Sequence, residues 1–174
     1  MKINILGGGI AGLASAIFLS KQGHEVTIVE RNDYINELGA GIQITPNAIR
    51  VLDALGIRND FINLAEQSTS LSIRRAENSA LLQKVSMHRL VKDKKVGFYH
   101  LHRYKLLNLL KDNAIKNKVK IISNQYINKI IITKDNVRIF SNDIEYDSDI
   151  LIGADGLNSI SRKKLNEDYM PKYS

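Results

Sequence analysis

Three glycines near the amino terminus have the spacing that points most directly to chemistry. Gly7, Gly9 and Gly12 form a G-x-G-x-x-G pattern, with Ile10 and Ala11 between the second and third glycines. In such a pattern the first glycine permits a tight turn, the second lets the backbone approach a pyrophosphate, and the third lets a helix pack closely. Phosphate oxygens then accept hydrogen bonds at the positive end of the helix dipole. The spacing therefore predicts a dinucleotide site.

The segments on either side of the glycines are the ones that such a site needs. Residues 2–6 are a short apolar run typical of a buried strand, residues 10–21 read as a helix, and residues 25–30 read as a second strand. Glu30 closes that strand, where a carboxylate can accept hydrogen bonds from ribose hydroxyls. A carboxylate there repels a 2′-phosphate and favours FAD or NAD over NADP, although the adjacent Arg31 weakens that preference.

Two other interpretations of the first thirty residues are weaker. A chance cluster of glycines does not account for strands in matching positions. A signal peptide is imitated by Lys2, an apolar stretch and Ala14-Ser15-Ala16. However, glycines interrupt the apolar stretch, and a strand follows with no sign of a processing junction. Without such a signal, we expect a cytoplasmic location.

Composition limits the classes of protein to consider. The 174 residues suffice for one domain, or for one and part of another, with a sizeable core. No apolar run approaches the roughly eighteen residues that a membrane span needs, so we expect no membrane span. The absence of cysteine excludes disulfides, thiolate metal sites and cysteine nucleophiles.

Positive charge is concentrated in the middle of the chain. Seven of the Lys and Arg residues lie between positions 84 and 105, against one acid, Asp93, and the chain as a whole carries a net charge of +7. Few aromatic residues are interleaved and no nucleic-acid motif is present, so we expect no nucleic-acid partner. A solvated basic loop is the simpler interpretation, and attraction of an anionic cofactor or substrate is the alternative.

The rest of the chain predicts an α/β fold with an antiparallel insertion. Helices are expected from Thr45 to Gly56, over residues 59–65, over residues 103–116 and from near Asn158. Strands are expected over residues 70–74, 81–87, 98–101, 119–123, 126–133, 137–140, 144–146 and 149–152. The whole chain, 1–174, is thus predicted to be one Rossmann-like domain containing a parallel sheet with helices, in which residues 68–101 form an antiparallel insertion on the substrate side.

His100 and His102 would share one face of a strand, but no third metal ligand is evident.

These motifs together resemble the FAD-dependent aromatic-hydroxylase (group A) type of flavoprotein monooxygenase, which includes salicylate, kynurenine and 4-hydroxybenzoate hydroxylases. The matching stretches are the glycine pattern with Glu30-Arg31, residues 39–47 (GAGIQITPN), His102-Arg103, and residues 149–159 (DILIGADGLNS) followed by Arg162. They occur in the family's order and spacing, and the resemblance covers essentially the whole chain.

The resemblance implies FAD as cofactor, NAD(P)H as transient electron donor and an aromatic or similar planar small molecule as substrate. The cofactor-binding residues that it implies are Gly7, Gly9, Ile10, Ala11, Gly12, Glu30, Arg31, Gly41, Ile42, Arg103, Ile127 and Asp155. It assigns Glu30 to the adenosine ribose, Gly41 and Ile42 to the flavin ring, and Arg103 and Asp155 to the middle of the cofactor. Ile127 is implied as a backbone contact to the adenine. For Asp155 the alternative is a turn that caps the next helix. No catalytic residue is indicated, because in this family the cofactor performs the difficult chemistry.

Members of this family are much longer and carry a later glycine-aspartate motif and a substrate-covering sheet. The chain therefore resembles the amino-terminal part of a monooxygenase, and a separately encoded carboxyl-terminal half is an expected partner. An FAD-dependent reductase or dehydrogenase without oxygen transfer, and a non-catalytic nucleotide-binding module, are the alternatives.

Overall fold

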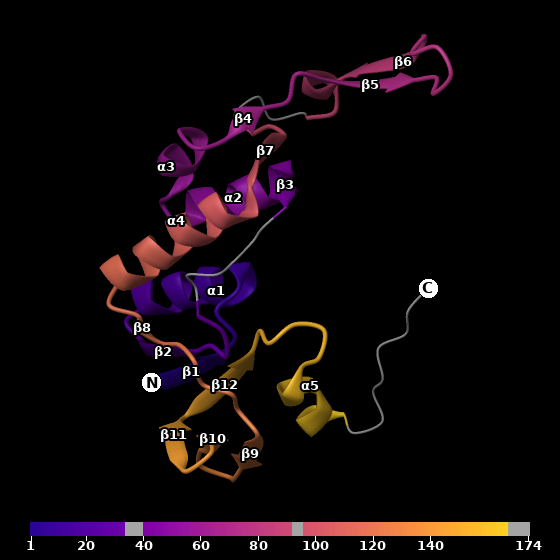
Figure 1. Ribbon diagram of the computed structural model, residues 1–174. Helices are drawn as coiled ribbons and strands as arrows, with labels where there is room; N and C mark the ends of the chain where they lie inside the picture. Colours follow the sequence, from indigo (N-terminus) through magenta and orange to yellow (C-terminus); the bar gives the residue numbers. More distant parts are fainter. Residues whose placement is uncertain (34–39, 92–95, 167–174) are drawn as a thin grey trace. The chain divides into compact units, whose positions relative to one another are not determined.

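The computed structural model describes residues 1–33, 40–91 and 96–166, which fall into two units. The first unit contains the described residues of Met1–Leu38 and Leu107–Ser174, and the second those of Gly39–Leu106 (Figure 1). Within the described residues, no helix has the length and apolar character needed to cross a membrane.

A parallel sheet of four strands forms the centre of the first unit. Its strands are β1 (Lys2–Leu6), β2 (Glu25–Val29), β8 (Lys120–Ile122) and β12 (Ile150–Gly153), in the order β12-β1-β2-β8. Leu6 at the end of β1 lies opposite Val29 of β2 and Gly153 of β12. The carboxyl ends of these three strands therefore meet at one edge of the sheet.

Helix α1 (Ile10–Lys21) connects β1 to β2 and packs against both strands. Its side chains Leu13, Ala16 and Ile17 are fully buried, as is Ile5 of β1. A helix between two neighbouring parallel strands is the crossover connection expected in such a sheet. Both faces of β1 and β2 are covered, so each strand buries its last four residues, including the polar Asn4 and Thr27.

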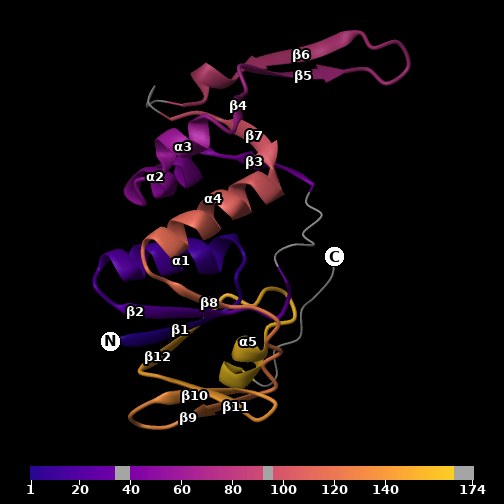
Figure 2. The same ribbon diagram turned by 60° about the vertical axis from the view of Figure 1, so that its left-hand side comes forward.

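A small antiparallel sheet belongs to the same unit. It consists of β9 (Lys129–Ile132), β10 (Val137–Ser141) and β11 (Ile144–Ser148), with β10 in the middle. Leu6 and Val29 share a buried cluster with Ile127, Ile130 and Ile139. Figure 2 shows α1 and this small sheet on opposite sides of the parallel sheet, so the unit has three layers. Helix α5 (Ile160–Leu165) follows β12.

The second unit combines short helices with antiparallel strands. Its elements are β3 (Gly41–Ile44), α2 (Pro46–Ala54), α3 (Arg58–Ile62), β4 (Glu66–Gln67), β5 (Ser70–Arg74), β6 (Leu81–Ser86), the 3-10 turn η2 (Met87–Arg89) and β7 (Tyr99–His102). Strands β3, β7 and β4 form one sheet, and β5 and β6 form a separate hairpin. Phe61 and Tyr99 pack edge to face in the core, with ring centroids 5.5 Å apart. Helix α4 (Arg103–Lys116) begins in this unit and continues into the first.

The predicted mixed α/β fold is confirmed, but several element boundaries were wrong. The helix expected over residues 59–65 is shorter, α3, and β4 follows it without a clear signal in the sequence. The strand expected over residues 126–133 begins only at Lys129, because Ile127 turns into the core and Gln125 donates its backbone N–H to the Glu30 carbonyl. Strand β6 stops at Ser86, where the backbone N–H of Met87 bonds to the carbonyl of Thr69.

Candidate functional site

Three segments at the carboxyl ends of neighbouring strands form the candidate site in the first unit. The glycine turn, residues 7–12, follows β1, Glu30 follows β2, and the turn of residues 154–156 follows β12. Ala154 donates its backbone N–H to the carbonyl of Leu6 at 2.8 Å, which holds the first and third segments together. Ligands of open parallel sheets bind at this edge.

The glycines are needed for this packing. Gly7 has φ +105°, and a Cβ at this position would lie 2.4 Å from the carbonyl oxygen of Ala154. A Cβ on Gly12 would lie 2.0 Å from the carbonyl oxygen of Gly7. By contrast, a Cβ on Gly9 would meet nothing within 4 Å. The first and third glycines thus permit close backbone contact, whereas the second borders open space at the start of α1.

The amino terminus of α1 is suited to an anion. Gly9 is its N-cap residue, and no side chain caps the helix. The N–H groups of a helix's first turn, which here include those of Ile10 and Ala11, have no partner within the helix. They carry the positive end of the helix dipole. With open space beside Gly9, this end of α1 fits the pyrophosphate of a dinucleotide.

Glu30 lies beside the glycine turn, as the sequence predicts. Its carboxylate accepts hydrogen bonds from the backbone N–H of Gly8, at 2.6 Å, and of Asn32, at 2.8 Å. Its own backbone is fixed by bonds to Ile122 and Gln125. A carboxylate has about four acceptor positions, so two bonds leave capacity for ribose hydroxyls. Arg31 next to it is exposed.

Asp155 makes a different set of contacts. Its carboxylate accepts hydrogen bonds from the backbone N–H of Ile160 and Ser161, and from the hydroxyls of Ser159 and Ser161, at 2.6 to 3.1 Å. Partial burial acts to raise the pKa of the Asp155 carboxyl, but the bonds from Ser161 and Ser159 outweigh it and hold that pKa below its usual value. These are the contacts of a cap on α5, the alternative that the sequence left open. A cofactor role for Asp155 stays a prediction.

Sequence reasoning missed the two serines that hold Asp155. Ser159 and Ser161 are buried, and a Cβ on Gly153 would lie 2.0 Å from the Ser161 hydroxyl oxygen. The backbone N–H of Arg162 donates to the Ser159 hydroxyl oxygen, and the Arg162 guanidinium donates to the Gly156 carbonyl at 2.6 Å. The signal that could have revealed this network is the D-x-x-x-S-x-S spacing at the start of a helix.

The second unit brings together other predicted site residues. The backbone N–H of Arg103 donates to the carbonyl of Ala40 at 3.1 Å, and Gly41 lies opposite His102 in the pairing of β3 with β7. Arg103 is half-buried, as is Ile42. The amino end of α4 is thereby fixed beside the start of β3. Gly39, the first residue of the motif over 39–47, lies outside the described residues, as do Lys92, Lys94 and Lys95 of the basic segment.

His100 and His102 share the exposed face of β7, as predicted. Nδ1 of His100 lies 2.6 Å from the hydroxyl oxygen of Ser68. Across the described residues, no group of three His, Cys, Asp or Glu side chains is placed to hold a metal ion.

Comparison with known proteins decides the family. A model described as the FAD binding domain matches residues 1–173. The chain is 32% identical over 171 residues to 3-hydroxybenzoate 6-hydroxylase of Klebsiella oxytoca, covering 97% of this chain and 43% of that one. The chain belongs to the FAD binding domain family.

Further relatives agree with this assignment. The domain is 28% identical over 176 residues to 3-amino-4-hydroxybenzoate 2-monooxygenase of Streptomyces cremeus, covering all of this chain and 44% of that one. Its fold is that of HpxO from Klebsiella pneumoniae, solved with FAD, at a TM-score of 0.86, 21% identity, and coverage of 99% and 44%. The chain thus spans less than half the length of the relatives it matches.

Ile127 has a packing role in this FAD binding domain. Its side chain is buried in the cluster with Leu6 and Val29, behind the ends of β1 and β2. The neighbouring Asn128 donates its backbone N–H to the carbonyl of Phe140. A backbone contact from Ile127 to adenine, implied by the resemblance, stays a prediction.

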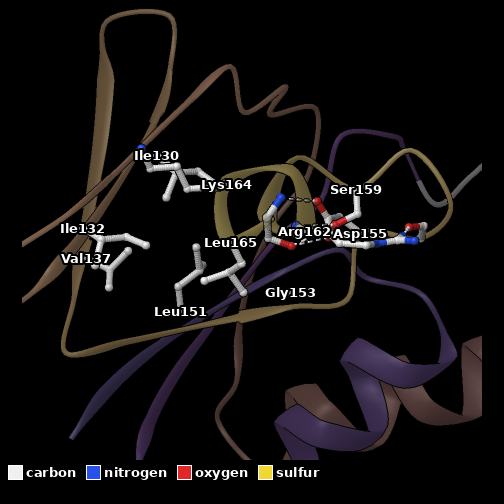
Figure 3. A pocket seen from close by; sticks show the side chains of 12 residues that line it. Ile130, Ile132, Val137, Leu151, Gly153, Asp155, Ser159, Arg162, Lys164 and Leu165 are labelled. Atoms are coloured by element: carbon white, nitrogen blue, oxygen red, sulfur yellow. Dashed lines mark hydrogen bonds between the residues drawn. The ribbon is translucent and has the colours of Figure 1, made fainter. Parts of the chain in front are cut away.

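A cavity of about 380 Å³ lies in the domain's first unit, and Gly153, Asp155 and Gly156 at the end of β12 line part of it. It is bordered by β12, by α5 and by the antiparallel strands β9 and β10 (Figure 3). Most of its wall is apolar, although Asp155 and Arg162 contribute at one end.

Proposed function

We propose that this chain is the FAD-binding part of an NAD(P)H-dependent monooxygenase that hydroxylates an aromatic or similarly planar small molecule. The observation that carries the proposal is the junction of the glycine turn, Glu30 and the turn of residues 154–156 at the ends of β1, β2 and β12. Named relatives that hydroxylate benzoates support the reaction class.

The residues fit FAD in distinct ways. The N–H groups of Ile10 and Ala11 would receive the pyrophosphate, because they open an uncapped helix beside Gly9. Glu30, already oriented by two backbone donors, would accept hydrogen bonds from the adenosine ribose. Arg103 offers planar donors suited to phosphate oxygens. When bound, FAD would supply the redox and oxygen-transfer chemistry.

Several other roles are proposed from the resemblance. Gly41 and Ile42 would lie near the flavin ring, Asp155 would stay close to the middle of the cofactor, and the antiparallel segment of residues 68–101 would face the substrate. Asp155 would serve mainly through the turn that it stabilises, since its carboxylate already accepts four hydrogen bonds.

The protein would work in the cytoplasm.

We also propose that the complete enzyme requires a further carboxyl-terminal part, corresponding to the length of the relatives that this chain does not cover. The relatives supply the reason: only 43% of the Klebsiella oxytoca enzyme is covered by this chain. The same observation favours a second candidate, a nucleotide-binding module without activity of its own. A third candidate is a reductase or dehydrogenase. It would differ from the monooxygenase in passing its electrons on without transferring oxygen.

Flavin absorbance separates these candidates first. The purified chain, reconstituted with FAD and freed of unbound cofactor, should show the flavin bands in the visible spectrum. A chain that stays colourless under saturating FAD would contradict a flavoprotein role. With FAD bound and the carboxyl-terminal part present, NAD(P)H oxidation stimulated by hydroxybenzoates should yield a hydroxylated product. Oxidation without that product would indicate a reductase.

A further inference from the structure

The sheet of β3, β7 and β4 carries a row of polar side chains on its exposed face. Strand β7 lies between β3 and β4 (Figure 1), and its buried and exposed residues alternate, with His100 and His102 on the exposed side. His100 lies directly opposite Gln43 of β3 and directly opposite Glu66 of β4. Directly opposed residues of antiparallel strands point to the same face. Gln43, His100 and Glu66 therefore form one row across the sheet, here called the polar row.

Ser68 fixes the imidazole at the centre of the polar row. Its hydroxyl oxygen lies 2.6 Å from Nδ1 of His100, and its backbone N–H donates to the carbonyl of Phe98 at 2.8 Å. Among the residues that the structure describes, Ser68 is the hydrogen-bond partner of the His100 ring, which leaves Nε2 for a ligand. A hydroxyl can accept the Nδ1–H, and the lone pair is then on Nε2. Nε2 can thus take up a proton without breaking the bond to Ser68.

The two neighbours in the polar row suit a proton acceptor. The Cβ atoms of directly opposed residues are about 5 Å apart. Glu66 therefore brings a negative charge close to His100, which would offset the positive charge of a protonated imidazole. Gln43 carries an amide N–H donor for an oxygen that has lost its proton. On this face of β3, β7 and β4, the ionisable groups other than His100 are Glu66 and His102.

The same face is open to a planar molecule at one end of β3. Gly41 lies directly opposite His102, and a Cβ on Gly41 would meet only the carbonyl oxygen of Leu101, at 4.0 Å. Gly41 is also proposed above to lie near the flavin ring. Two residues along a strand span about 7 Å, which is comparable with the length of a substituted benzene ring. A substrate ring beside Gly41 could therefore present a substituent to His100.

We infer that His100 is the proton acceptor for the ring hydroxyl of a phenolic substrate. The O–H bond of the phenol would break, its electron pair would stay on the oxygen, and the proton would move to Nε2 of His100. The Gln43 amide would donate to the phenolate oxygen, and the proton would leave to water after turnover. A phenolate ring is richer in electrons than a phenol, which suits hydroxylation of the ring. The inference rests on the proposed function and narrows its substrates to phenols, with Ser68 as a positioning residue.

Ionisation of a bound phenol tests the inference without turnover. The probe is 3-hydroxybenzoate, and benzoate, which lacks the ring hydroxyl, is the matched ligand. A phenolic hydroxyl has a pKa of about 10, as in tyrosine, so free 3-hydroxybenzoate has almost no phenolate at neutral pH. Ultraviolet difference spectra at millimolar ligand should show at least a tenfold larger phenolate fraction on the unmodified chain. NMR spectra should show that the His100 ring signals shift with 3-hydroxybenzoate.

Variants on the exposed face separate proton transfer from folding. His100→Gln should abolish phenolate formation and leave benzoate binding within about twofold. His102→Gln is the matched control, because it changes an exposed histidine of the same strand, and it should retain the phenolate signal. Ser68→Ala should lower the phenolate fraction by about three- to tenfold, as expected for one lost hydrogen bond, and Ser68→Thr should restore it. All four variants should unfold at the temperature of the unmodified chain.

Three results would overturn the inference: no binding or no ionisation of 3-hydroxybenzoate on the unmodified chain, phenolate formation that persists in His100→Gln, and equal loss in His102→Gln. Flavin absorbance is recorded on the same samples after reconstitution with FAD. A chain that binds FAD but leaves the phenol un-ionised would refute the role of His100 and retain the proposed function. A chain that ionises the phenol but stays colourless under saturating FAD would refute the proposed cofactor and retain the proton acceptor.

Discussion

Two turns at the same edge of the parallel sheet use their polar groups in opposite ways. The glycine turn after β1 leads into α1, which has no side-chain cap, and Gly9 borders open space. The turn after β12 leads into α5, where Asp155 accepts four hydrogen bonds from the helix start. Both turns follow an apolar parallel strand, but only the first leaves its helix start available. A helix that the protein does not cap itself is the one that can bind an anion.

The difference also explains how the two turns depend on each other. Gly7 packs directly against Ala154, so the open turn rests on the closed one. A carboxylate that caps α5 thereby contributes to the shape of the site without touching a ligand. The following predictions test this division of roles.

The largest effect is expected at Gly12. In Gly12→Ala the new Cβ would lie 2.0 Å from the Gly7 carbonyl oxygen, and neither backbone can move without disturbing the turn. We expect a loss of about 3 kcal/mol in the free energy of unfolding, as for other overpacked sites. Chemical denaturation measures it. Gly9→Ala, with no neighbour within 4 Å, is the control and should retain stability while weakening FAD binding.

Asp155→Ala should destabilise the chain by about 2 kcal/mol, because it removes a helix cap and leaves buried donors unpaired. Thermal unfolding of the chain without FAD measures this loss. Because the expected role of Asp155 is structural, the loss of stability should already be measurable in the chain without FAD. If stability is unchanged and only FAD affinity falls, Asp155 contacts the cofactor instead.

Glu30→Ala should weaken FAD binding by about 1–3 kcal/mol, because ribose hydroxyls lose their acceptor and Gly8 loses its partner. Fluorescence titration with FAD gives the affinity. Glu25→Ala, at the exposed start of β2, the strand that Glu30 follows, is the matched control and should bind FAD normally. Equal affinity in both variants would argue against the ribose role.

The smallest effect is a pH dependence. The pKa of Asp155 is lower in the folded state than its ordinary value, so the stability it contributes is present above that ordinary value and is lost as the pH falls through the folded-state pKa. The difference in melting temperature between the unmodified chain and Asp155→Asn should therefore be largest near neutral pH and shrink below about pH 4. Asp143→Asn, in an exposed turn, should show no such trend. A constant difference would mean that the charge of Asp155 is unimportant.

Much of the first unit could be predicted from sequence because local patterns and tertiary contacts agree there. The glycine spacing, the apolar runs of β1 and β2 and the position of Glu30 all specify the same crossover. The fate of Asp155 could not be predicted, because its choice between ligand and helix cap depends on where Ser159 and Ser161 place their hydroxyls. Strand β4 was missed since its pairing with β7 involves residues more than thirty positions apart.

The hairpin of β5 and β6 has a consequence for engineering. Every residue of β5 is exposed, and the two strands pair with each other rather than with any described sheet. Its tip, around Glu77 and Asn78, can therefore change length without altering the register of another strand. Insertion of an epitope or a fluorophore should be tolerated there, so the hairpin tip is a position at which the protein can be extended without altering either core.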